Sequence, residues 1–543
     1  MAAWLLTRML LVVTPKTQRL AVTDIVTDKL YFRTPASRRL SAFLFTGIFA
    51  GVFVAISGCE RSVPEAEQGD KALVKQETER QALAARFDLP LASLPDSEIA
   101  SFYAGRALAH QPWVKAPSST TARDGLGPLF NARSCLGCHD KGGRGKMPVD
   151  ETSPVFTALL RLGIEGLSVE GNQQAINHEV SQQLGALPEP VYGLQLQPQS
   201  TALSSQLGIP SKEGEAVAEG DLRIRWIFSD VVYPDGKITQ LRTPEVVLRS
   251  LNYGPLHPDT RMSLRQAPGM FGMGLIDAIP QADIDALADP DDRNKDGISG
   301  RVNQVWNPVL QETVPGRYGW KANRPDLMTI SAAAFADDIG ITNPIFPGQP
   351  CTSAQAACLQ EKTGNNHEGF ELPQDLLELT VNFLRYTGAP EQRELSQKGK
   401  ALFNSAGCQS CHHPEYLVDS NRVTGNQAPG NRVPGKNGTG TLRVGVLKVS
   451  PYSDFLLHDM GTALADNRRD FIASGSEWRT APLWGIGLQK QISGELSLLH
   501  DGRARSVEEA VLWHGGEALM ARERFIRMTA HERQQLIQFV EAL

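Results

Sequence analysis

The stretches CLGCH at residues 135–139 and CQSCH at residues 408–412 decide how this sequence is interpreted. Two thiols at this spacing can add to the two vinyl groups of one porphyrin, and the histidine that follows brings an imidazole to the iron. A zinc site is an alternative, but it would not need a histidine after each cysteine pair. A redox C-x-x-C pair would not need to occur twice. The motifs therefore predict two covalently bound haem c groups, held by Cys135, Cys138 and His139 and by Cys408, Cys411 and His412.

The segments next to the motifs favour helices. One helix is expected over residues 96–110, before the first motif, and another over residues 394–403, before the second. Residues 373–386 are expected to form a helix that leads into the second haem domain. Residues 529–543 place apolar side chains at helical spacing behind a threonine N-cap, which predicts a C-terminal helix.

The composition limits the class of protein. The chain has 543 residues, of which 41% are hydrophobic and 21% are charged, as in globular proteins. The formal net charge of −6 argues against a nucleic-acid partner and favours a basic protein partner. The seven cysteines are too few for a disulfide scaffold. Six residues separate Cys351 from Cys358, and this pair is expected to form a loop disulfide, the alternative being two unpaired thiols.

The N-terminal segment predicts export. Two arginines at residues 38–39 precede an uncharged apolar run at residues 40–56, as in a signal peptide. The residues that end at Cys59 resemble a bacterial lipobox, whose cysteine is acylated after cleavage. An uncleaved membrane anchor is the alternative. We expect a signal over residues 1–59, a charged spacer over residues 60–90, and a periplasmic protein held by lipid on the inner or outer membrane.

Several segments resemble one family. They lie at residues 130–145, 274–280, 292–303, 452–461, 477–487 and 499–518. They are similar to the di-haem cytochrome c peroxidase superfamily, which includes MauG, and more closely to the bacterial di-haem oxidoreductases that are often labelled thiol oxidoreductase-like. The resemblance implies a mainly α fold with two cytochrome c-like haem domains, at residues 91–220 and 373–543. Between them, a hairpin pattern at residues 222–241 predicts a β-containing insertion over residues 221–372.

The ligand on the second face of each iron decides the function, because a filled position gives an electron-transfer haem and an open one can bind a substrate. In the superfamily, an axial ligand of the second haem lies fourteen residues after the histidine of an H-x-G motif. That motif is His500-Asp501-Gly502 here, and the implied ligand is His514. Met460 is the competing ligand.

The first haem has no obvious second ligand. His178, Met270 and Met273 are candidates, but an open position is the better expectation, and it would make this the reactive iron. No catalytic side chain can be named from the sequence. Three tryptophans are candidate electron relays or simply core residues, and Trp484 is favoured because it lies in a family-like segment: Trp306, Trp484 and Trp513.

A loop at residues 292–303 copies the start of an EF-hand calcium loop. Its candidate ligands are Asp292, Asn294, Asp296 and Ser299, with glycine at the sixth position. Asn303 replaces the glutamate of the twelfth position, and an Asx-rich turn is the alternative. Calcium is therefore a candidate ligand of this loop.

Together these features predict a periplasmic di-haem oxidoreductase. Its second haem would store electrons from a small cytochrome or copper protein, and its first haem would react with peroxide or another small substrate. A non-catalytic electron-transfer cytochrome with two six-coordinate haems is the alternative. Thiol oxidation is a third interpretation and depends on the family label alone.

Overall fold

The computed structural model describes residues 86–120, 123–164, 179–202, 217–423 and 445–543. The predicted export signal with Cys59, the spacer up to residue 85, and His178 lie outside the described residues. Most of the Gly/Pro/Asn-rich segment at residues 421–441 also lies outside them. Within the described part of the chain, no helix combines the length and the apolar composition that a bilayer crossing requires.

The prediction of a mainly α fold is wrong. Among the described residues, 31% are helical and 20% lie in strands, which form many small sheets. Strands occur even within the region predicted as the second cytochrome c-like domain, as the pairs β10–β11 and β12–β13. The helices next to the motifs misled the prediction, because the chain between them forms strand pairs and irregular loops.

The helices vary from four to fifteen residues. Their bounds are α2 Asp96–His110, α3 Cys135–Cys138, α6 Met273–Ala278, α7 Gln281–Asp285, α8 Leu327–Asp338, α9 Ala356–Gln360, α10 Gln374–Tyr386, α11 Gln397–Ala406, α12 Ser420–Val423, α13 Ile486–Ser493, α14 Val507–Trp513, α15 Leu519–Arg527 and α16 Ala530–Ala542.

The described strands form six antiparallel sheets, of which five have two strands and one, β3–β2–β7, has three. Their bounds are β1 Leu129–Phe130, β2 Ala158–Ile164, β3 Gln195–Leu196, β4 Gln199–Ser200, β5 Asp221–Val232, β6 Ile238–Arg249, β7 Thr260–Gln266, β8 Gln304–Asn307, β9 Glu312–Pro315, β10 Tyr416–Asp419, β11 Val446–Val449, β12 Leu457–Asp459 and β13 Glu477–Arg479.

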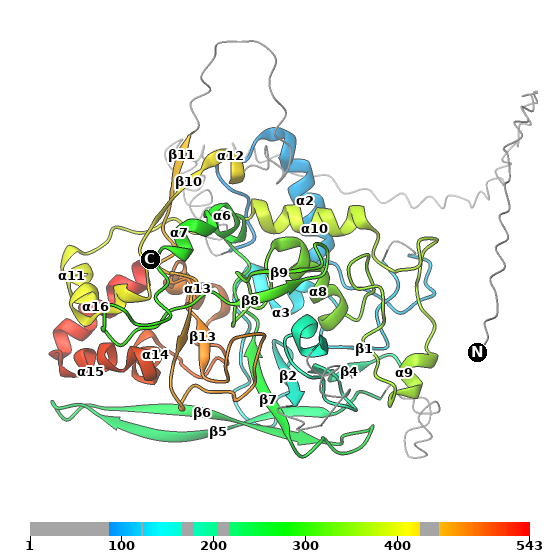
Figure 1. Cartoon of the computed structure of the whole chain (residues 1–543), viewed down its shortest axis with the longest axis horizontal. Coiled ribbons are helices and arrows are strands. Elements are labelled where there is room, and N and C mark those ends of the chain that lie inside the picture. Colours follow the sequence, from blue (N-terminus) through cyan, green and yellow to red (C-terminus); the bar gives the residue numbers. More distant parts are fainter. Residues whose placement is uncertain (1–85, 121–122, 165–178, 203–216, 424–444) are drawn as a thin grey trace, which may run out of the picture. The chain divides into compact units, whose positions relative to one another are not determined.

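Helices α2 and α10 pack closely and support the first motif (Figure 1). Phe102 and Phe383 meet across the contact with ring centroids 5.5 Å apart, and both are fully buried. Gly105 allows this approach, because a Cβ at this position would lie 2.0 Å from the carbonyl oxygen of Leu379. Helix α8 packs against α10 in turn. The helix predicted over residues 96–110 is α2, with the same bounds.

Helices α11 and α16 support the second motif in the same way. Phe403 on α11 meets Phe539 on α16 with ring centroids 5.3 Å apart. Thr529 and Glu532 form a capping box at the start of α16, so the predicted threonine N-cap is confirmed. Gly407 ends α11 with a φ of 90°, a backbone conformation that favours glycine, and turns the chain directly into Cys408.

The predicted hairpin is the long two-stranded ribbon β5–β6 (Figure 1). Its turn is stabilised by the carboxylate of Asp235, which accepts a hydrogen bond from the backbone N–H of Lys237 at 3.1 Å. At the tip, the Tyr233 hydroxyl donates to Glu508 on α14 at 2.8 Å. At the other end, Arg225 donates to Glu151 at 2.8 Å. The ribbon therefore joins the region after the first motif to the C-terminal helices.

All the residues that the structure describes belong to one compact unit. The boundaries expected within it, at residues 220 and 372, stay predictions.

Candidate functional site

The first C-x-x-C-H motif lines a cavity of about 170 Å³. Cys135 and Cys138 lie on the short helix α3, and His139 follows directly. Burial raises the pKa of both thiols to about 12, so they are protonated at neutral pH. The structure thus brings two neutral sulfurs and one imidazole to the same enclosed space.

His139 has one ring nitrogen occupied and one available. Its Nδ1 donates a hydrogen bond to the carbonyl oxygen of Pro268 at 2.6 Å, since a carbonyl can only accept. Pro268 lies just after strand β7, which is held by its pairing with β2. Burial lowers the pKa of His139 to about 4, so the ring is neutral and the Nε2 lone pair can bind a metal.

The second motif repeats this arrangement in a cavity of about 310 Å³. Cys408, Cys411 and His412 all line it. Nδ1 of His412 donates to the carbonyl oxygen of Tyr452 at 2.9 Å. Burial lowers the pKa of His412 to about 4, which again leaves Nε2 able to bind a metal.

Both candidate second ligands line the second cavity. His514 ends helix α14, and its Nδ1 donates to the carbonyl oxygen of Ala510 at 2.7 Å, so its Nε2 is available too. Burial is the main cause that lowers the pKa of His412, and the charge of His514 is a smaller one. The two imidazoles therefore lie close enough to interact. Met460 also lines the cavity. The structure therefore keeps both residues as candidates.

The first cavity offers a different set of side chains. Met270 and Met273 line it, whereas Arg133 and Asp140, which flank the motif, do not. Asp338, the last residue of α8, is the only carboxylate among the described residues that line this cavity. Gln195 donates to its Oδ1 at 3.0 Å. Burial raises the pKa of Asp338 to about 6, close to the pH at which proton transfer is most useful.

The two cavities adjoin. Five described residues line both of them: Arg144, Trp320, Arg479, Ala481 and Ile486. The indole of Trp320 donates to the carbonyl oxygen of Gln266 at 2.8 Å. Its own carbonyl oxygen accepts the backbone N–H of Arg479 at 2.9 Å. Trp320 is therefore a fixed aromatic ring at the junction of the cavities.

Sequence reasoning missed this tryptophan. Of the three candidate relays, Trp484 lines the first cavity, and Trp306 and Trp513 line neither of the two. Trp320 lies outside the quoted family-like segments, so no local signal distinguishes it from a core residue. Only the fold brings it between the motifs.

A family model described as "Di-haem oxidoreductase, putative peroxidase" matches residues 76–543. The chain belongs to the di-haem oxidoreductase family. The family expected from the sequence is thereby confirmed. A search of the curated proteins and a search of the solved structures each find no match.

The side chains of this di-haem oxidoreductase fit two haems. Each cavity provides a cysteine pair and a neutral histidine with an available Nε2. The cysteine pairs line different cavities, so they cannot share one zinc ion. Nη1 of Arg144 is buried without a hydrogen-bond partner, and a propionate carboxylate would supply one.

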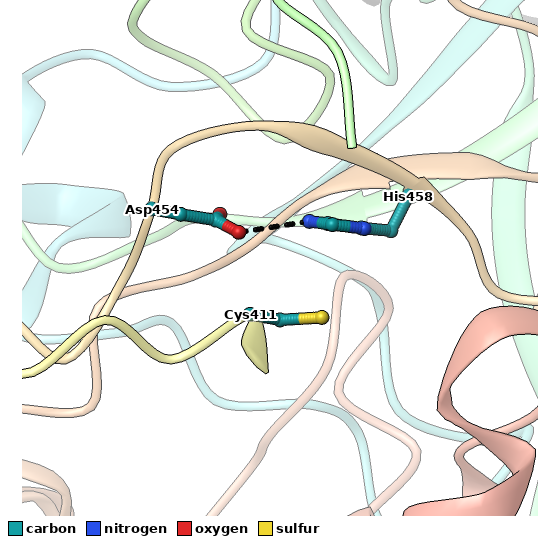
Figure 2. A group of neighbouring side chains, drawn as sticks. All are labelled: Cys411, Asp454 and His458. Carbon is teal, nitrogen blue, oxygen red and sulfur yellow. Dashed lines mark hydrogen bonds and ion pairs between the residues drawn. The ribbon is translucent and has the colours of Figure 1, made fainter. Parts of the chain in front are cut away.

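A further group of side chains lies beside the second motif of the di-haem oxidoreductase (Figure 2). Atoms of Cys411, Asp454 and His458 lie within 4.8 Å of one another. Nε2 of His458 contacts Asp454 at 2.9 Å, and Nδ1 contacts Glu517 at 2.7 Å. Burial alone would lower the pKa of His458, but the hydrogen bonds with these carboxylates raise it well above the usual value. A carboxylate at each ring nitrogen therefore favours the protonated, cationic form of His458.

The calcium-like loop forms a tight turn of its own. The backbone N–H of Asp296 donates to Asp292 Oδ1 at 3.0 Å and to Asn294 Oδ1 at 2.9 Å. The hydroxyl of Ser299 donates to Glu517 at 2.8 Å and not to a residue of this turn. The amide of Asn303 donates to the buried carbonyl oxygen of Lys321 at 2.7 Å. The loop thus keeps three of its four candidate ligands together.

Cys351 and Cys358 are joined by a disulfide. It closes the loop that ends in helix α9, and Cys358 is buried there. Neither cysteine lines the two cavities.

Proposed function

We propose that this di-haem oxidoreductase is a lipid-anchored periplasmic protein that reduces peroxide or a similar small substrate. Haem c would be attached by thioether links to Cys135 and Cys138 and to Cys408 and Cys411. His139 and His412 would be the proximal ligands. The acidic net charge suits a basic electron donor such as a small cytochrome, and the acylated Cys59 would hold the protein at the membrane.

The unequal second faces of the two cavities support this division of roles. In the second cavity, His514 and Met460 accompany His412, so a six-coordinate electron-storing haem suits it. In the first cavity, His139 is the only histidine among the described lining residues, and Asp338 supplies a carboxylate. An open iron face next to a carboxyl group suits chemistry, whereas two filled faces suit electron transfer alone.

Once bound, haem supplies one-electron redox chemistry at iron and, at an open face, a position for peroxide. The overall conversion consumes two electrons and two protons and releases two waters. Asp338 would accept a proton from peroxide on Oδ2, since Gln195 holds Oδ1, and would return it to the departing oxygen. Trp320, at the junction of the cavities, would carry electrons between the two sites.

Replacing His514 with alanine should convert one low-spin haem signal to high-spin, because the second haem loses its sixth ligand. Electron paramagnetic resonance of the oxidised protein would measure it. His531 lies on α16 and lines neither cavity, so His531→Ala is the matched control and should leave the spectrum unchanged. An unchanged spectrum for His514→Ala would instead assign the ligand to Met460, and Met460→Ala would then give the high-spin signal.

The alternative function predicts a different spectrum of the wild-type protein. A non-catalytic electron-transfer cytochrome should show two low-spin haems that neither peroxide nor cyanide changes. The proposed enzyme should show one high-spin haem that cyanide converts to low-spin. Thiol oxidation, the third interpretation, would show as oxygen or acceptor reduction that depends on added thiol.

We also propose that calcium binds the loop of Asp292, Asn294 and Asp296. Removing it with a chelator should lower the midpoint temperature of unfolding by a few degrees, because a ligand that binds only the folded state stabilises it. Differential scanning calorimetry in the presence and absence of chelator would measure the change. Asp292→Asn should abolish the response to chelator. A chelator-insensitive wild-type protein would contradict calcium binding.

A further inference from the structure

The structure leaves two arginines without an anionic partner at the junction of the cavities. Arg144 and Arg479 line both cavities, and no ion pair joins either one to a carboxylate among the described residues. Their burial lowers the pKa of each guanidinium to about 10. For Arg479, the positive charge of Arg144 lowers it further. Two partly buried cations therefore line the same junction between the cavities.

Several buried arginines of this protein have a carboxylate partner, whereas the buried Arg317 donates to backbone carbonyl oxygens instead. Arg265 and Arg468 bind Asp470, at 2.5 and 2.6 Å, and Arg503 binds Asp501 at 2.6 Å. Buried charges are costly unless they are paired or hydrogen-bonded, and these arginines follow that rule. Arg144 departs from it, because its Nη1 is buried without a hydrogen-bond partner, and this orphaned donor indicates an anion that belongs to the loaded protein.

The side chains are positioned to receive it. The backbone N–H of Arg144 donates to Gln489 at 3.0 Å, and its guanidinium carbon lies 5.4 Å from the ring centroid of Trp320. Nε of Arg479 donates to the carbonyl oxygen of Gly319 at 2.9 Å. Nη1 of Arg144 has no partner. In the first cavity, these two are the only Lys or Arg side chains among the described lining residues.

We propose that Arg144 and Arg479 form a shared anion clamp that binds propionate carboxylates of both haems and raises both reduction potentials together. Each haem carries two propionates, and guanidinium groups bind carboxylates through paired hydrogen bonds. An electron added at either iron is stabilised by the positive clamp, so one pair of side chains sets both potentials. The inference depends on the two haems of the proposed function but not on peroxide reduction.

The test is a redox titration of the intact protein, with the two haems followed by their separate spectra. Arg144→Gln and Arg479→Gln should each lower both midpoint potentials, by roughly a tenfold change in the oxidised-to-reduced ratio, which is about 59 mV for one electron. Arg144→Lys keeps the charge and should restore most of the shift. Arg133→Gln is the matched control, because Arg133 is exposed next to the first motif and lines neither cavity.

The outcomes separate the clamp from the proposed function. Haem content and thermal unfolding of each variant are measured first, so that a folding defect is recognised, and Arg144→Lys then carries the test. Unchanged potentials, or a shift of only one haem, would overturn the shared clamp. A wild-type chain with fewer than two haems would instead contradict the proposed function.

Discussion

Replacing Cys135 and Cys138 together with alanine should leave a protein that carries one haem instead of two and does not reduce peroxide. The two thiols line the first cavity and are the side chains that would form its thioether links. Mass spectrometry of the intact chain and a haem assay in alkaline pyridine would measure the loss.

Two controls accompany this variant. Replacing Cys408 and Cys411 should remove the other haem, with loss of the low-spin signal. Replacing Cys351 and Cys358, which form the disulfide away from both cavities, should leave two haems in place. If the Cys135/Cys138 variant kept two haems, covalent attachment at this motif would be wrong.

Replacing Asp338 with asparagine should lower kcat/KM for peroxide by about 10² to 10⁴-fold, the usual contribution of a positioned acid–base group. The wild-type kcat/KM should rise as the pH increases through about 6, because the carboxyl group must be deprotonated to accept a proton from peroxide. The variant should lack this rise. Steady-state kinetics from pH 5 to 8 would show both effects.

The neighbouring residue provides the control. Asp337 forms an ion pair with Arg161 at 3.1 Å and lines neither cavity. Asp337→Asn should therefore change kcat/KM only a few-fold and keep the rise with pH, moved to lower pH because the charge of Asp337 contributes to the raised pKa of Asp338. If Asp338→Asn retained both the wild-type rate and the wild-type profile, Asp338 would not be the acid–base group.

The local elements of the fold could be predicted, but the fold class could not. Helices α2, α10 and α16 and the β5–β6 hairpin were found because caps, apolar periodicity and a turn signal act over a few residues. The mainly α class was wrong because it extended two helix-flanked motifs to whole domains. Strand pairs such as β12–β13 are only three residues long, which is too short for a periodic signal.

The residues of the candidate site also fall into those that the sequence could predict and those that it could not. The cysteines and proximal histidines could be named because haem attachment requires the C-x-x-C-H spacing, which is visible along the chain. Asp338, Arg144 and Trp320 could not, because they reach the cavities from α8, from the loop after α3 and from the loop after β9. These three residues are far apart in the sequence and line the same cavity only in the folded chain. Likewise, the buried His458 gives no signal in the sequence, because its two carboxylate partners lie beside it only in the folded chain.

The β5–β6 ribbon has a consequence for electron tunnelling. It binds Glu151 near one end and Glu508 at its tip, so it spans from the surroundings of the first motif to those of the second. Tunnelling rates fall steeply with separation, and a tether of this kind would help to hold the two cavities at a fixed distance from each other. The rate of electron transfer between the two sites would then depend on the difference between their reduction potentials and not on motion of one site relative to the other.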